Sequence, residues 1–304
     1  MTDLILPVGT QVVSRVEVKA PDGKTCVPVG AVGVIVKAPT DNEHSYRVKF
    51  VDGFEAALKR NELTIRKAYQ QNAIQPDEVQ NDDARFYEYV IYRCIVGSRA
   101  FGLETDASDT DRRGIYLPPA DLHWSLWGVP EQLENEATQE AYWEMRKFLI
   151  LALKANPNIL ECLYTPLIET VTPLAEELLA MRECFLSQMV YQTYNGYVMS
   201  QFKKLEQDLR SRGEIRWKHA MHLIRLLLSG VTVLSKGYVP VRVEGHRDQL
   251  LAIKRGELSW AEISDWRLSL HKEFDAALSV TKLPERPDYK RANEFLIKAR
   301  REMV

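Results

Sequence analysis

A glycine, a serine and a pair of aspartates form the pattern in this sequence that is best suited to chemistry. Gly97-Ser98 follows the apolar run Cys94-Ile95-Val96, and Asp109-Thr110-Asp111 comes a short distance later. A glycine lets the backbone approach a phosphate closely, and aspartates at i and i+2 of a strand lie on one face. A divalent cation relieves the repulsion between two such carboxylates and bridges to phosphate oxygens. The pattern therefore predicts a strand, a phosphate-binding turn and a second strand that carries metal ligands.

A two-metal site usually takes a third carboxylate from a neighbouring strand. Glu140 is the leading candidate, because it lies between an acidic loop and the amphipathic segment that runs from Tyr142 to Lys154. Glu136 and Glu144 are its rivals, since one sequence fixes the ends of a strand only to within about two to four residues.

One predicted helix, residues 214–234, offers cations for phosphate groups in its segment 216–227. Lys218, His222 and Arg225 have the spacing i, i+4 and i+7, so they share one helix face, whereas leucines occupy mainly another. We expect Lys218 and Arg225 to contact the phosphates of a nucleotide, with His219 or His222 completing the pocket. The alternative is ion pairing with acidic side chains, for example Glu136 or Glu144.

The glycine-serine and aspartate motifs resemble those of the DNA polymerase β-like nucleotidyltransferases, in which Gly-Ser, a spacer of similar length and Asp-x-Asp follow one another. A bacterial and phage branch of nucleotidyltransferases is more similar still. The resemblance extends over about residues 86–300. It rests on the segments Gly97–Leu103, Ser108–Tyr116, Arg146–Leu149 and Leu153–Asn158.

The resemblance implies a Mg²⁺-dependent enzyme that moves a nucleoside monophosphate from a nucleoside triphosphate to an acceptor hydroxyl and releases pyrophosphate. The acceptor would be an RNA end or a protein. The family's metal ligands correspond to Asp109 and Asp111, and its third carboxylate, whose spacing is not fixed, to Glu140; two Mg²⁺ ions are expected, with Mn²⁺ as a substitute. The expected nucleotide-binding residues are Gly97, Ser98, Arg99, Arg113, Lys218, His219, His222 and Arg225.

The composition is that of an ordinary globular chain. Its 304 residues are 45% hydrophobic and 27% charged, which is enough for more than one buried core. The formal net charge of -2 gives no overall attraction for nucleic acid, so an RNA acceptor needs a local basic patch. The four cysteines contain no Cys-x-x-Cys pair, and neither a signal peptide nor a long apolar run is present. These features predict a cytoplasmic protein without membrane segments.

Three regions are expected in an α+β, multidomain chain. Short strand-like runs with glycine-bearing turns in residues 1–67, such as Tyr46–Gly53, resemble a small SH3-like β-barrel. Residues 68–84 are polar and aperiodic, which is typical of a linker. Residues 85–190 are expected to form a mixed-sheet nucleotidyltransferase domain, and residues 191–304 a helical domain that closes the nucleotide cleft.

Two other functions fit the same sequence. The fold could serve as a catalytically silent nucleotide sensor or a toxin-neutralising partner, although the retained pair Asp109 and Asp111 favours catalysis. Arg216 and His222 also have the Arg-x5-His spacing that one group of small helical ribonucleases uses. Cleavage of RNA without added metal would favour this third function.

Overall fold

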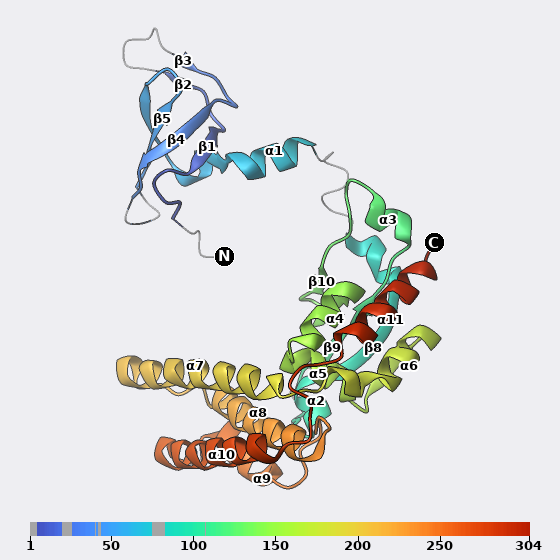
Figure 1. Cartoon of the computed structure of the whole chain (residues 1–304). Helices are drawn as coiled ribbons and strands as arrows, with labels where there is room; N and C mark the ends of the chain where they lie inside the picture. Colours follow the sequence, from blue (N-terminus) through green and yellow to red (C-terminus); the bar gives the residue numbers. More distant parts are fainter. Residues whose placement is uncertain (1–4, 20–25, 40, 42–43, 75–82, 107) are drawn as a thin grey trace. The chain divides into compact units, whose positions relative to one another are not determined.

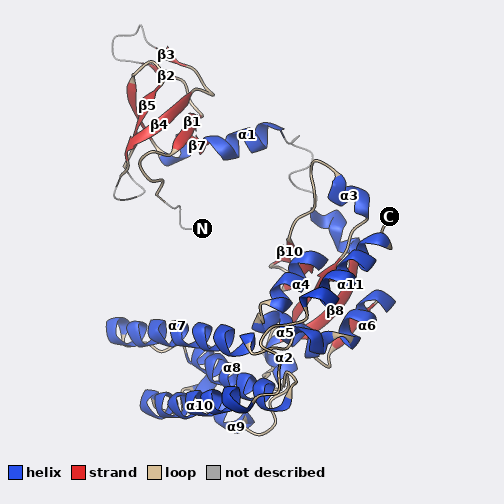
Figure 2. Cartoon of the chain, in the orientation of Figure 1, coloured by secondary structure: helices blue, strands red, loops and turns tan. Residues whose placement is uncertain are grey.

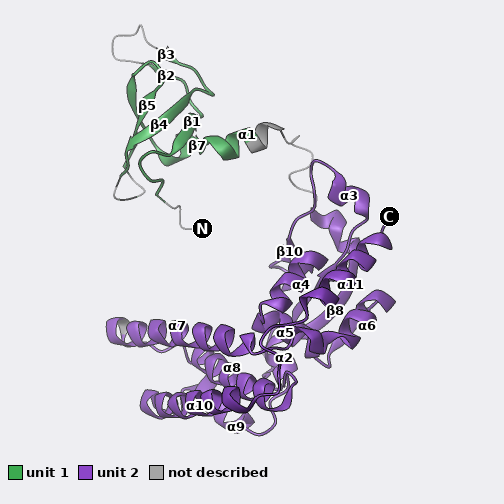
Figure 3. Cartoon of the chain, viewed as in Figure 1, with its two compact units in different colours: residues 1–82 green, residues 83–304 purple. Residues whose placement is uncertain are grey.

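The strands of the computed structural model fall into two groups along the chain, and each group forms sheets of its own (Figures 1 and 2). The structure describes all residues except 1–4, 20–25, 40, 42–43, 75–82 and 107. Residues 1–82 and residues 83–304 form separate units, which Figure 3 distinguishes by colour. An α+β architecture with many helices is therefore confirmed.

The first unit contains a five-stranded antiparallel sheet with the order β6-β5-β4-β1-β7. In β5, Tyr46, Val48 and Phe50 are buried and the residues between them are exposed, as strand alternation requires. The described pairings leave β6 and β7 at the two edges, so they do not close this sheet into a barrel, and the SH3-like barrel stays a prediction. The strands are β1 (Gln11–Ser14), β2 (Val18–Lys19), β3 (Cys26–Val27), β4 (Val32–Lys37), β5 (Tyr46–Phe50), β6 (Glu55–Leu58) and β7 (Leu63–Ile65).

The expected linker, residues 68–84, contains regular structure at both of its ends. Helix α1 (Arg66–Ile74) covers its first part, and a 3-10 helix, η3 (Asp83–Tyr89), begins in its last part. Residues 75–82 lie outside the described residues.

A mixed sheet forms the centre of the second unit, as the sequence predicts. Its order is β10-β11-β9-β8-β12, with β9 parallel to β11 and the other neighbours antiparallel. Ile115 and Trp143 belong to the large hydrophobic core, whereas Tyr116 and Tyr142 belong to a smaller cluster on the other face. The strands are β8 (Val90–Val96), β9 (Asp111–Tyr116), β10 (Gln132–Asn135), β11 (Glu140–Glu144) and β12 (Ile168–Val171).

Helices pack around this sheet and then form a bundle beside it (Figure 1). The first group is α2 (Gly97–Phe101), α3 (Ala120–Trp124), α4 (Met145–Leu153), α5 (Pro157–Tyr164) and α6 (Pro173–Ala180). The bundle comprises α7 (Met189–Arg212), α8 (Trp217–Lys236), α9 (Arg247–Arg255) and α10 (Trp260–Val280). Helix α8 contacts α7, α9 and α10, which makes it the central helix of the bundle. No described helix is both long and apolar enough to cross a membrane.

The last helix, α11 (Tyr289–Arg301), leaves the bundle and returns to the sheet region. It packs on α4, and Arg300 Nη2 lies 2.6 Å from Glu144 Oε1 at the end of β11. The chain enters and leaves the bundle at adjacent points, as the hydrogen bond from the Gln188 backbone amide to the Pro284 carbonyl over 2.9 Å shows. The bundle is therefore inserted between η4 (Arg182–Phe185) and α11, whereas the sequence predicts one helical region from residue 191 to residue 304.

Candidate functional site

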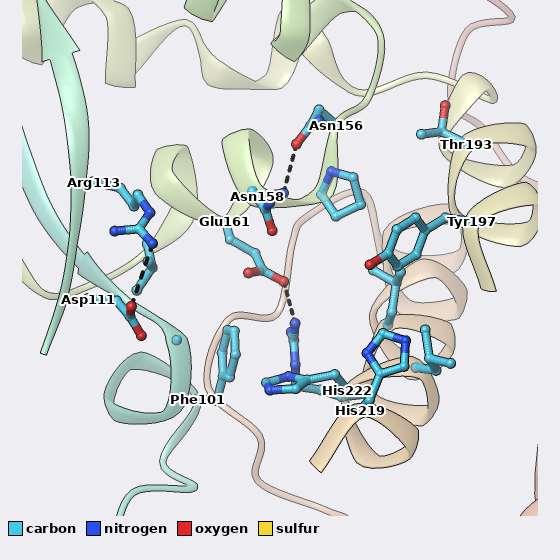
Figure 4. Close-up of a pocket in the computed structure, with 16 residues that line it drawn as sticks. Phe101, Asp111, Arg113, Asn156, Asn158, Glu161, Thr193, Tyr197, His219 and His222 are labelled. Atoms are coloured by element: carbon cyan, nitrogen blue, oxygen red, sulfur yellow. Dashed lines mark hydrogen bonds and ion pairs between the residues drawn. The ribbon is translucent and has the colours of Figure 1, made fainter. Parts of the chain in front are cut away.

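A cavity of 430 Å³ lies between the end of the second sheet and the helices α5, α7 and α8 (Figure 4). Gly97, Asp111 and Arg113 line it on the side of β8 and β9. Glu161 and Arg225 line it from α5 and α8. This volume is within the range of small-molecule sites, about 300–1,000 Å³.

Gly97 and Asp111 meet because β8 and β9 are antiparallel neighbours. Val96, the last residue of β8, pairs with Asp111, the first residue of β9. Gly97 has a left-handed φ of 71°, and a Cβ at this position would lie 2.5 Å from Asp111 Oδ2. The carboxylate is thus packed against bare backbone, and only glycine leaves room for it.

A Gly97→Ala variant is expected to be less stable than a matched Gly213→Ala variant. Both glycines have a left-handed φ, 71° and 69°, but nothing lies within 4 Å of a Cβ at Gly213. The conformation alone costs about 1–2 kcal/mol for an L-residue, and the contact with Asp111 adds to that cost only at Gly97. Urea unfolding followed by tryptophan fluorescence measures both free energies, and equal losses would contradict the contact.

Asp109 lies in the loop before β9 and is exposed. The expectation that Asp109 and Asp111 alternate along one strand is wrong, because the strand begins only at Asp111. Arg99 maintains the loop conformation: its Nη2 donates to the Ser108 carbonyl over 2.9 Å, and its Nε donates to the Asp109 carbonyl over 3.3 Å. Arg99 therefore positions the segment that carries Asp109, and Ser98 is half-buried in α2 beside Gly97.

Arg113 faces the same cavity as Asp111. Its Nη2 lies 3.5 Å from Asp111 Oδ1, and its Nη1 donates to the Arg112 and Gln139 carbonyls over 2.8 and 2.9 Å. These bonds hold the guanidinium near the start of β9, where its positive charge balances the negative charge of Asp111.

The structure does not bring Glu140 together with Asp111. In the parallel register of β11 and β9, Glu140 pairs with Arg112, and Ala141 pairs with Arg113. Paired residues share a face, so Glu140 lies on the opposite face of the sheet from Asp111.

The two rival carboxylates are also elsewhere. Glu144 is buried, accepts from the Arg146 amide at the start of α4 over 2.9 Å and pairs with Arg300. Burial raises the pKa of Glu144, and the nearby Arg300 opposes that rise. Glu136 is exposed in the turn between β10 and β11.

Arg225 enters the cavity from α8 and is only 6% exposed. Its Nη2 lies 2.7 Å from Glu161 Oε1, and its guanidinium carbon lies 3.5 Å from the centre of the Phe101 ring. Among the described residues, its Nε and Nη1 are buried without a hydrogen-bond partner. The acidic partner of this cation is thus Glu161, rather than Glu136 or Glu144, and two of its nitrogens have no hydrogen-bond partner among the described residues.

The other residues of the α8 face separate in space. His219 and His222 line the cavity with Arg225, and the His222 ring contacts Phe101 edge-on at 6.1 Å between ring centres. Lys218 is exposed and lines a neighbouring surface hollow instead. Arg216 Nη2 donates to Asp208 Oδ2 over 2.5 Å at the start of the helix, so its contact is with α7.

His222 is held neutral by its surroundings. Burial lowers its pKa to about 3, and the positive charges of Arg225, Lys218 and Lys254 act in the same direction. Burial also lowers the pKa of His219, with Arg216 and Lys204 adding to the effect. A neutral imidazole can accept or donate a hydrogen bond but cannot supply charge to a phosphate.

Acid is expected to destabilise the second unit through His222. Its pKa falls from 6.5 to about 3 on folding, so only the unfolded chain takes up this proton between those values. The contribution of His222 to the free energy of unfolding is complete above pH 6.5 and declines as the pH falls, with a loss of about 2 kcal/mol at pH 5. Urea unfolding at pH 7 and pH 5 measures it. A His222→Asn variant should lose less stability between these pH values than a His246→Asn variant, which removes an exposed histidine of the same unit. Equal pH slopes would contradict this prediction.

Sequence reasoning did not assign a role to Asn158, Glu161, Thr193 or Tyr197, which also line the cavity. The start of a helix at Asn156-Pro157-Asn158, which can be read from the sequence, could have indicated Asn158 and Glu161. Asn156 caps α5, with Pro157 as its first residue. Helical spacing from that start puts Asn158 and Glu161 on one face.

The family model RlaP, described as "RNA repair pathway DNA polymerase beta family", matches residues 65–298. The chain belongs to this family. A similar protein is the uncharacterized protein YcgL of Bacillus subtilis (strain 168), which is 27% identical over 170 residues. That match covers 54% of this chain and 64% of YcgL, so the chain spans less than two thirds of this relative's length.

RlaP membership confirms the polymerase β-like family that the sequence resemblance indicates. The matched range contains the whole sheet of the second unit and the bundle with α8. Both sides of the cavity therefore belong to the RlaP region, and most of the first unit lies outside it.

Proposed function

We propose that this chain is a Mg²⁺-dependent nucleotidyltransferase that moves a nucleoside monophosphate from a nucleoside triphosphate to an acceptor hydroxyl on an RNA end or a protein. Pyrophosphate is the second product. One observation carries the proposal: the Asp111 carboxylate is packed against the Gly97 backbone at a cavity that also holds a buried cation, Arg225. A polymerase β-like family supports this reaction class, and we propose the cytoplasm as the place of action.

The donor chemistry of Asp111 and Asp109 fits a hard divalent cation. Carboxylate oxygens are the ligands that Mg²⁺ prefers, and Mn²⁺ accepts the same ligands. Asp111 presents such oxygens in the cavity, and Asp109 lies two residues earlier on an exposed loop. Among the described side chains, no group of three or more His, Cys, Asp or Glu residues is arranged to hold a metal ion. Asp109 and Asp111 are therefore the proposed ligands, without Glu140. When bound, Mg²⁺ neutralises phosphate charge and lowers the pKa of the attacking hydroxyl.

The remaining residues bind and orient the triphosphate. The bare backbone at Gly97 and the adjacent Ser98 admit phosphate oxygens close to Asp111. Arg225 donates its free Nε and Nη1 to the phosphates, while Glu161 fixes the guanidinium through Nη2. Arg113 stabilises the charge that develops on the leaving group. Lys218, outside the cavity, attracts the triphosphate over a longer range.

The experiment uses the full chain with each of the four ribonucleoside triphosphates, labelled at the α-phosphate, and Mg²⁺. Total RNA and a protein mixture serve as acceptors, and both pyrophosphate and labelled product are measured. We expect pyrophosphate release in step with labelling of RNA or protein, and loss of both with EDTA. Tight triphosphate binding with neither product would identify a nucleotide sensor and overturn the proposal. RNA cleavage in EDTA, lost in a His222→Asn variant, would identify the ribonuclease instead.

A further inference from the structure

One part of the lining of the 430 Å³ cavity, formed by residues 156–158 and α7, carries no charged side chain, whereas the ion pairs Asp111–Arg113 and Glu161–Arg225 line the rest. Asp111 and Arg113, an ion pair, lie on the side of the sheet. On the far side, Asn158 of α5 and Thr193 and Tyr197 of α7 are polar but uncharged (Figure 4). Charged groups suit the phosphates of a nucleotide, whereas neutral hydrogen-bonding groups and an aromatic ring suit its base.

Asn158 and Tyr197 present unused polar groups to this cavity. The Asn158 amide points into the cavity in Figure 4, as does the hydroxyl of Tyr197. Within the described residues, neither side-chain group makes a hydrogen bond, whereas the Asn158 backbone amide donates to Asn156 Oδ1 over 3.0 Å. Tyr197 is 46% exposed, although its neighbours Tyr194 and Val198 on α7 are fully buried. A side-chain amide offers a donor and an acceptor together, which is what the polar edge of a base requires.

Both residues are held on rigid supports. The Asn156 cap and Pro157 fix the start of α5, and Asn158 is the second residue of that helix. Thr193 Oγ1 donates to the Lys154 carbonyl at the end of α4 over 3.0 Å. Because Tyr197 lies one turn after Thr193 on α7, this bond fixes the part of α7 that carries Tyr197 relative to the end of α4. Binding groups on helices are positioned more precisely than groups on loops, which favours selection of one base over another.

We propose that Asn158 and Tyr197 hold the base of the bound nucleoside triphosphate, Tyr197 by packing against the ring and Asn158 by bonding its polar edge. This inference rests on the proposed function and assigns an orientation to its substrate. The phosphates lie toward Gly97 and Asp111, and the base lies toward α5 and α7. The same two residues therefore set the preference among the four bases.

The test compares nucleotides with a ligand that has no base. The full chain is titrated with each ribonucleoside triphosphate and with inorganic tripolyphosphate in Mg²⁺, by calorimetry. Tyr197→Ala and Asn158→Ala variants are each expected to bind the preferred nucleotide about tenfold more weakly, with the affinity for tripolyphosphate unchanged. Tyr197→Phe keeps the ring and should retain most of the affinity. Tyr289→Ala, which removes an exposed tyrosine of α11, is the matched control.

Each outcome is decisive. Wild-type affinities and wild-type base preference in both alanine variants would overturn the assignment and leave the proposed function intact. Weaker labelling of RNA with unchanged nucleotide affinity would assign Asn158 and Tyr197 to the binding of the acceptor, and it would also overturn their assignment to the base. A wild-type chain that binds no triphosphate would overturn the proposed function together with the inference. Equal thermal unfolding midpoints of the four variants establish that affinity, rather than folding, has changed.

Discussion

An Asp111→Asn variant is expected to lose nucleotidyl transfer by a factor of about 10³ or more while it stays folded. Asparagine has nearly the same shape, so the contact with the Gly97 backbone is retained. The change removes the negative charge that we propose as a Mg²⁺ ligand, and it leaves Arg113 without its carboxylate partner at 3.5 Å. Pyrophosphate release under saturating triphosphate and Mg²⁺ measures the loss.

The control for Asp111→Asn is Asp265→Asn, the same chemical change at an exposed position of α10. We expect this control to retain the wild-type rate. Raising Mg²⁺ or substituting Mn²⁺ should restore little of the Asp111→Asn activity, because this variant lacks the proposed carboxylate ligand. A variant that keeps more than about a tenth of the wild-type rate, an effect of only about 1.4 kcal/mol, would contradict the metal-binding role of Asp111.

A Glu161→Gln variant is expected to lower the free energy of unfolding of the second unit by about 3–5 kcal/mol. Arg225, which is only 6% exposed, would then lose the carboxylate that lies 2.7 Å from its Nη2. A buried cation without a partner costs far more than the net stabilisation that the intact pair provides. Joint replacement, Glu161→Gln with Arg225→Met, should therefore be less destabilising than Glu161→Gln alone.

Tryptophan fluorescence is well suited to this measurement, because all six tryptophans lie in residues 83–304. Urea unfolding followed by this signal reports the second unit within the full chain. The matched control is Glu294→Gln, which breaks an exposed pair with Lys290 at 3.9 Å and should cost no more than about 0.5 kcal/mol. Equal effects of Glu161→Gln and Glu294→Gln would show that the buried pair does not stabilise the fold.

The sequence was sufficient for the contact between Gly97 and Asp111 but not for the third carboxylate. Apolar runs before Gly97 and after Asp111 predict neighbouring strands, and a glycine at the bend allows their close approach. The position of Glu140 depends on the register of β11 against β9, which no local pattern reveals. A shift of one residue moves a side chain to the other face, and the observed register places Glu140 opposite Arg112.

Long-range packing also decided the partners of the α8 cations. Helical spacing correctly predicts that His222 and Arg225 face the same way, and both line the cavity. It cannot show that Arg225 meets Glu161 of α5, because that pair depends on how the bundle packs against the sheet region. Lys218 differs from the other two because it lies near the exposed start of α8, where little chain covers it.

The segments that enter and leave the helical bundle connect the two sides of the candidate site. Gln188 bonds to Pro284, and the Asp288 amide donates to the Cys184 carbonyl over 2.8 Å, so the incoming and outgoing segments are tied together. With α11 anchored on the sheet through Arg300 and Glu144, any swing of Tyr197 and Arg225 toward Asp111 must bend both segments at once. The helices that carry Tyr197 and Arg225 are thus joined to the sheet region by two segments that are bonded to each other, rather than by a single free linker.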